Sequence, residues 1–181
     1  MKKLILASLA ASVLLFFWGW IWWGPIASGL GMIQTVPDEA SLGESLASHL
    51  PADGVYVLPY AMAGDESAAL HESGPIATVY FRAAGAPVMA PGVFAKGFAH
   101  MWVSVLLMAA LLRWLSPRLV SFGERFRLVV GAGLATAVFD HLGRPVWFYE
   151  SWSYHGFLTA YSITSWVLVG LVLAWFLHGD T

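Results

Sequence analysis

Hydrophobic residues in this chain gather in four long, nearly unbroken runs, whereas a soluble fold would show shorter periodic stripes. Each run is long enough to cross about 30 Å of hydrocarbon at the rise of about 1.5 Å per residue of an α-helix. The pattern therefore predicts four transmembrane helices. They occupy residues 4–23, 97–115, 128–148 and 157–177.

The segment 24–96, between the first and second hydrophobic runs, has a different and more polar composition. Leucines recur at four-residue spacing after Asp38, which predicts a capped helix that ends near His49. Runs rich in Val, Tyr and Phe at 54–60 and 75–82 predict two β-strands. These few elements bury too little surface to be stable alone. We therefore expect the segment to pack against the helices, a second copy or a partner protein.

The predicted fold class is a membrane all-α protein, a four-transmembrane-helix bundle with a small extracytoplasmic α+β insertion between helices 1 and 2. A cytoplasmic loop, 116–127, and an outer loop, 149–156, join the later helices. Short links of this kind predict that the second and third helices are antiparallel neighbours. Small residues at four-residue spacing, which allow close helix packing in lipid, occur as Ser8/Ser12, Gly131/Ala135 and Gly156/Ala160.

The first hydrophobic run follows two lysines and could be mistaken for a secretory signal peptide. Its roughly 20 apolar residues exceed the 7–15 typical of a signal peptide, and no clear small-x-small cleavage site follows, so an uncleaved anchor is predicted. With a cytoplasmic N-terminus, six of the nine basic residues lie inside, in agreement with the positive-inside rule. The sequence thus predicts a multi-pass protein of the bacterial inner membrane with cytoplasmic N- and C-termini. The six are Lys2, Lys3, Arg113, Arg118, Arg125 and Arg127.

Tryptophans cluster near the ends of the predicted helices, where their amphipathic rings favour the membrane–water interface. This placement agrees with the orientation given by the basic residues. The tryptophans predicted to contact the lipid interface are Trp18, Trp20, Trp22, Trp23, Trp114, Trp147, Trp152 and Trp175.

Composition narrows the class of protein further. The chain has 181 residues, 59% hydrophobic and 11% charged, against about 25% charged in soluble domains, so a soluble protein is excluded. A net charge of −2 leaves no basic surface for nucleic acid. The lack of cysteine excludes disulfides, thiolate metal sites and cysteine nucleophiles. Neither Gly-x-Ser-x-Gly nor His-Glu-x-x-His occurs.

Ionisable residues inside the predicted helices lie at one depth. His100 and Asp140 are each 13 residues from a basic residue at the inner end of their helix, about 20 Å above the inner interface. An aspartate near mid-membrane costs at least about 2.5–3.5 kcal/mol unless it is paired or hydrated. Asp140 should therefore pair with Arg144, one turn away, or with His100. Hydroxyl side chains of the fourth helix fall near this level: Tyr161, Ser162 and Ser165.

Helical spacing groups these residues into a polar intramembrane cluster. The cluster either holds the helices together or has a functional role in binding a metal, relaying a proton or contacting a polar headgroup. His141 projects about 100° from Asp140 along a regular helix, so both can face one metal only if the helix is distorted. The predicted cluster comprises His100, Ser104, Thr136, Asp140, His141 and Arg144, and the candidate metal ligands are His100, Asp140, His141 and His155.

These features favour a non-catalytic role. We expect an integral inner-membrane accessory or assembly protein that contacts the lipid bilayer and that binds a protein partner or a second copy through periplasmic residues 24–96. No cofactor is predicted, and a metal ion is the lesser alternative. The alternative function is a small proton- or metal-linked transporter or membrane enzyme centred on His100 and Asp140.

Overall fold

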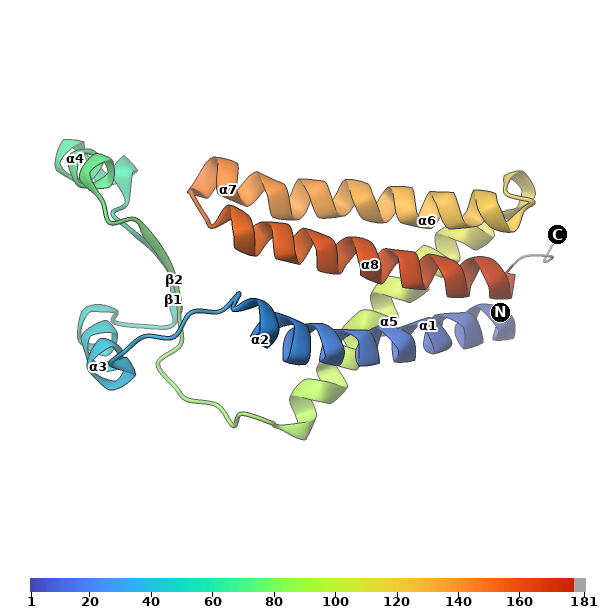
Figure 1. The fold of residues 1–181 in the computed structure, drawn as a ribbon, viewed down its shortest axis with the longest axis horizontal. Coiled ribbons are helices and arrows are strands. Elements are labelled where there is room, and N and C mark those ends of the chain that lie inside the picture. The colour runs from blue at the N-terminus through green and yellow to red at the C-terminus, as the bar shows by residue number, and fades with distance from the viewer. Residues whose placement is uncertain (178–181) are drawn as a thin grey trace. The chain divides into compact units, whose positions relative to one another are not determined.

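The computed structural model describes residues 1–177. Four of its helices are long and apolar enough to cross a membrane, which supports the prediction of a multi-pass membrane protein. The chain divides into two compact units. A helical unit comprises Met1–Ile33 and the chain from Met89 onward, and a smaller unit comprises Gln34–Val88 (Figure 1).

The first spanning helix is longer than predicted and runs without a break from Lys2 to Leu30. Proline has no amide hydrogen and usually interrupts a helix, but Pro25 is accommodated in a π-helical turn. Gly31, with a left-handed φ of 59°, ends the helix. Its three parts are α1 (Lys2–Ile21), η1 (Trp22–Ile26) and α2 (Ala27–Leu30).

The other three spanning helices also begin earlier than the hydrophobic runs. The second span has Pro91 in its first turn and no side-chain cap, whereas Ser121 and Ser151 accept hydrogen bonds from amides in the first turns of the third and fourth spans. Before the third span, the Ser121 hydroxyl accepts a hydrogen bond from the Glu124 amide at 3.2 Å, and the Glu124 carboxylate accepts one from the Ser121 amide at 2.9 Å. This reciprocal capping box places the helix start six residues before the predicted one. The elements are α5 (Pro91–Trp114), η3 (Ser116–Arg118), α6 (Phe122–Ala137), η4 (Val138–Leu142), α7 (Gly143–Phe148) and α8 (Trp152–Leu177).

The packing order of the helices differs from the predicted one. Figure 1 shows α6 alongside α8, with α1 on the other side of α8 and α5 crossing obliquely. The main partner of α5 is α1, and that of α6 is α8, so the expected pairing of the second and third spans is wrong within residues 1–177. The reason lies in α1, whose buried Ser8 and Ser12 allow other helices to approach closely.

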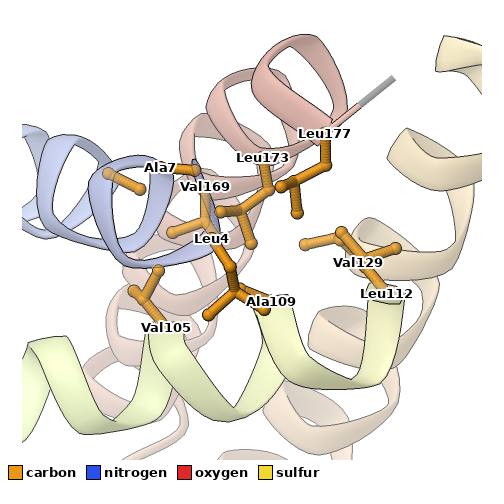
Figure 2. Packing of buried hydrophobic residues seen from close by; sticks show 10 residues of the cluster. Leu4, Ala7, Val105, Ala109, Leu112, Val129, Val169, Leu173 and Leu177 are labelled. Carbon is orange, nitrogen blue, oxygen red and sulfur yellow. The ribbon is translucent and has the colours of Figure 1, made fainter. Parts of the chain in front are cut away.

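A hydrophobic core joins all four spans near the N-terminal end of α1. Figure 2 shows side chains from α1, α5, α6 and α8 converging, among them Leu4, Leu112, Val129 and Leu173. A second cluster packs Trp22 and Ala27 against Phe157 near the other end of α1. The first cluster thus joins all four spans, whereas the second joins the first span to the fourth.

The smaller unit contains the predicted helix and the predicted pair of strands. Helix α3 (Glu39–His49) begins at Asp38, whose carboxylate accepts a hydrogen bond from the Ser41 amide at 3.0 Å, which confirms the predicted cap. Strands β1 (Gly54–Leu58) and β2 (Ala77–Phe81) pair antiparallel.

The stretch between these strands, for which no element was predicted, contains a short 3₁₀ turn, η2 (Ala61–Ala63), and a helix, α4 (Asp65–Ser73). Asp65 and Glu66 lie in the first turn of α4, where negative charge is favourable. The helix ends before Gly74, which has a positive φ of 69°. Its polar composition gave no hydrophobic pattern from which a helix could be predicted.

Candidate functional site

The strongest polar contacts in the helical unit form a charged cluster of Arg144, Glu150 and His155. The Arg144 guanidinium donates two hydrogen bonds to the Glu150 carboxylate, from Nε at 2.9 Å and from Nη2 at 2.6 Å. Such bidentate, charge-assisted pairs are among the stronger hydrogen bonds in proteins. His155 Nε2 lies 2.5 Å from Glu150 Oε2, and this imidazole is buried. One carboxylate therefore binds both a guanidinium and an imidazole.

The charged cluster stabilises the tight turn between α7 and α8. Tyr149 in this turn adopts a left-handed φ of 56°, which is uncommon for a residue with a side chain. The Ser151 hydroxyl then accepts a hydrogen bond from the Tyr154 amide at 3.3 Å at the start of α8. The hydrogen bonds from Arg144, the largest influence, and from His155 hold the pKa of the Glu150 carboxyl below its usual value. Glu150 is thus the central residue of this turn.

Glu150 was not among the predicted site residues. It lies in a loop, outside every hydrophobic run, so counting depth along the helices could not find it. The available signal was position: Arg144 lies near a helix end, and the next acidic residue along the chain is Glu150, six positions later.

Asp140 occupies a different place from the one predicted. Its side chain is 76% exposed, and its carboxylate lies 3.5 Å from Nδ1 of the neighbouring His141. Asp140 falls within the π-helical turn η4, in which hydrogen bonds join residues five apart, so the four-residue spacing to Arg144 no longer places both side chains on one face. Arg144 pairs instead with Glu150. The π-helical turn therefore contains both Asp140 and His141, the two residues that could face one metal only if the helix were distorted.

His141 links the third span to the fourth. Its Nε2 lies 2.9 Å from the Ser162 hydroxyl of α8, at the level where the sequence placed Ser162. The hydroxyls of Ser104 and Thr136 donate to backbone carbonyls of their own helices, to His100 and to Ala132 and Gly133. These two hydroxyls are satisfied locally. Interhelical hydrogen bonds join His141 to Ser162 and Trp102 Nε1 to the Ser8 hydroxyl of α1, the latter at 3.0 Å.

A cavity of about 350 Å³ lies between α1, α5 and α8. Its polar lining residues are the predicted His100 and Ser104 from α5 and the predicted hydroxyl residues of α8, so the structure brings this part of the polar layer together. Asp140 and Arg144 line a separate cavity of about 480 Å³ on η4 and α7. His100 and Asp140 are therefore not brought into contact. The α8 hydroxyls at the first cavity are those of Tyr161, Ser162 and Ser165.

The four candidate metal ligands do not converge. His155 contacts Glu150, His141 contacts Ser162 and Asp140, and His100 lines the cavity beside α1. Residues 1–177 contain no group of three or more His, Asp or Glu side chains placed to hold a metal ion. The residues available in this region suit hydrogen bonding to an organic group better than metal coordination.

The tryptophans predicted at the lipid interface fall into two sets. Trp22 is buried and stacks near Phe157 and Tyr161, and Trp18 packs on Trp22, so these two belong to the helix packing. The others expose much of their surface, as lipid-facing residues would. The exposed set comprises Trp20, Trp23, Trp114, Trp147, Trp152 and Trp175.

Arg125 is buried, although the sequence suggested only a role in orientation. Its Nε donates to the Leu119 carbonyl at 2.8 Å, and its Nη1 donates to the carbonyl of Leu177, the last residue of α8. A positive charge at a helix C-terminus is favourable and satisfies a carbonyl that lacks a helical partner. Arg125 thus ties the η3 turn and α6 to the end of α8.

Comparison with protein-family models, with curated proteins and with solved structures found no match to this chain. The function is therefore argued from the chemistry and the geometry of the chain itself.

Proposed function

We propose that this chain is an integral inner-membrane accessory or assembly protein whose 34–88 unit binds a protein partner in the periplasm. The proposal rests on one observation: the 34–88 unit has no hydrophobic interior. Of residues 34–88, Leu50 alone is buried. A unit of this size gains its stability from burial of apolar surface, so a covering surface must come from elsewhere.

The two-stranded sheet combines exposed apolar side chains with open backbone edges, as a protein-binding surface does. Val55 and Val57 of β1 lie on one face and are 60% and 40% exposed, while Leu58 on the other face is 44% exposed. A two-stranded sheet has two edges whose backbone groups are open to pairing with a further strand. The unit that contains the sheet is acidic, since residues 34–88 contain seven Asp and Glu against one Arg. The surface therefore favours a partner with an apolar strand and a basic rim.

Photo-cross-linking in intact cells tests this function. A photoreactive amino acid at Val57 is expected to give a discrete adduct of higher mass, because the valine face would be covered by the partner. The same amino acid at Glu66, an exposed acidic residue of α4, is the matched control and should give little adduct. Two differently tagged copies expressed together show whether the adduct contains a second copy of this chain. Equal labelling at both positions, or none at Val57, would contradict the proposal.

The proposed orientation can be checked with a reporter enzyme that is active only in the periplasm. Inserted near Gly64, it is expected to be active, and fused after Thr181 it is expected to be silent, because six of nine basic residues are assigned to the cytoplasmic side. The reverse pattern would place the 34–88 unit in the cytoplasm and would exclude a periplasmic partner.

The cavity at His100 favours a second candidate, a small proton- or metal-linked transporter or membrane enzyme centred on His100 and Asp140. In the structure these residues line separate cavities, so a shared centre would require α5 and η4 to approach each other. If His100→Gln and Asp140→Asn each fold normally but fail to complement a strain that lacks this protein, the result would support this candidate. Full complementation by both variants would support the accessory role.

A further inference from the structure

The cavity between α1, α5 and α8 exists because α5 crosses the other spans at an angle. Figure 1 shows α5 diverging from the other helices toward its N-terminal part. It packs mainly on α1 and only slightly on α8. Side chains from α1, such as Leu15, and from α8, such as Val169, line the space left between the helices. The cavity lies within the predicted spans, where lipid surrounds the helices.

The lining of this cavity selects against charged ligands. Its walls contain no Lys, Arg, Asp or Glu side chain among residues 1–177. A charged group there would lack a counter-ion in a medium of low polarity, which is costly. Most of the wall is apolar, with Leu15, Val105 and Val169 as examples. The expected ligand is therefore uncharged and lipid-soluble.

The side chains of Ser165 and His100, which line the cavity, can each form a hydrogen bond to a ligand. The Ser165 hydroxyl is buried, makes no hydrogen bond of normal geometry in the described part of the chain, and interacts with the hydroxyl of Tyr161. The His100 side chain is exposed, and its ring makes no hydrogen bond to any of residues 1–177, because the Ser104 hydroxyl contacts the backbone carbonyl of His100. A buried hydroxyl that lacks a hydrogen bond of normal geometry is unfavourable. A ligand with carbonyl oxygens could accept hydrogen bonds from both groups.

The aromatic walls indicate the shape of the ligand. Tyr161 and Trp166 both line the cavity, and flat aromatic side chains stack favourably on planar rings. A volume of about 350 Å³ lies at the small end of the range for small-molecule sites, roughly 300–1,000 Å³. We propose that this cavity binds the carbonyl-bearing ring of a lipid-soluble quinone, with His100 and Ser165 as hydrogen-bond donors and the hydrophobic tail directed into the bilayer. This proposal is independent of the partner proposed for residues 34–88.

The test is a titration of the purified full-length protein in detergent with a short-chain benzoquinone, followed through quenching of tryptophan fluorescence. Ser104→Phe fills the cavity and is expected to weaken binding at least about tenfold. The matched control is Val103→Phe, at the adjacent residue of α5, which is 53% exposed and does not line the cavity. It should bind as the parent does.

A second variant keeps the test decisive if Ser104→Phe does not fold. His100→Leu retains the size of the side chain but removes the donor, and a threefold to tenfold weaker binding is expected from the loss of about one hydrogen bond. A neutral diacylglycerol, which offers ester carbonyls without a planar ring, is titrated in parallel as a competitor. Displacement of the quinone by diacylglycerol at equal concentration, or equal quinone binding by the parent and His100→Leu, would overturn the proposal.

Discussion

Replacing Gly133 by alanine is expected to destabilise the helical unit by about 1–3 kcal/mol, the usual cost of overpacking a close-packed core. A Cβ atom at position 133 would lie 2.3 Å from Cγ and 2.4 Å from Cβ of Trp166. These two atoms lie close to the backbone of α8, so a rotamer change cannot move both away. The α6–α8 contact would have to open. Unfolding of the purified protein in detergent, by heat or by denaturant, measures the loss.

The control for this change is Gly131→Ala, two residues earlier on the same helix. No side chain or neighbouring backbone lies within 4 Å of a Cβ atom built at Gly131. Alanine there should leave stability unchanged or raise it by up to about 1 kcal/mol, because glycine is a poorer helix former. Equal losses in the two variants would mean that the Trp166 contact does not account for the effect at Gly133, because alanine is the better helix former at both positions.

These two glycines illustrate what the sequence could and could not predict. The small-residue stretch of the third span was correctly assigned to packing, but the predicted contact pair was Gly131 and Ala135. The residue in contact is Gly133. Both faces of a membrane helix are apolar, because lipid tails are as apolar as Leu, so hydrophobic spacing does not tell which face packs on another helix.

The same reasoning accounts for the successes and failures in the fold. The four spans follow from length and hydropathy alone, which the bilayer imposes. The pairing of α5 with α1 rather than α6 depends on the small residues Ser8 and Ser12 and on the crossing angle; the sequence shows the small residues but not which helix packs on them. The Asp38 cap and both strands follow local rules and were predicted. Helix α4 was missed because it has no apolar stripe.

In the candidate site, counting depth placed His100 level with the hydroxyls of α8, and these residues line one cavity. The expected pairing of Asp140 with Arg144 is not formed, because the π-helical turn η4 changes the direction of the later side chains in that span and Arg144 binds Glu150. Neither propensity nor composition marks such a turn. The pairing of Arg144 with Glu150 depends on the tight turn after α7, whose geometry includes the left-handed residue Tyr149.

Replacing Glu150 by glutamine is expected to cost about 1–3 kcal/mol of stability, because it removes the charge that binds Arg144 and leaves buried polar groups less well satisfied. His155 is 2% exposed, and its Nε2 would lose the carboxylate 2.5 Å away. Its Nδ1 already lacks a hydrogen-bond partner among residues 1–177. The control is Asp140→Asn, which removes a carboxylate from the neighbouring span where it is 76% exposed. Because a charge at membrane depth is costly, this change should leave stability unchanged or raise it.

The contribution of Glu150 should depend on pH in a definite direction. Its pKa is lowered in the folded protein, chiefly by the hydrogen bonds from Arg144, from an ordinary value of 4.5. A lowered pKa means that the folded state binds the proton less readily than the unfolded state, so the contribution is complete above about pH 4.5 and is lost as the pH falls through the lowered pKa. The difference in unfolding free energy between the parent and Glu150→Gln should therefore be constant from pH 7 to about pH 5 and shrink on further acidification. A difference that stayed constant down to pH 3 would show that the carboxylate charge does not stabilise the turn, and that the loss in Glu150→Gln arises from the shape of the side chain.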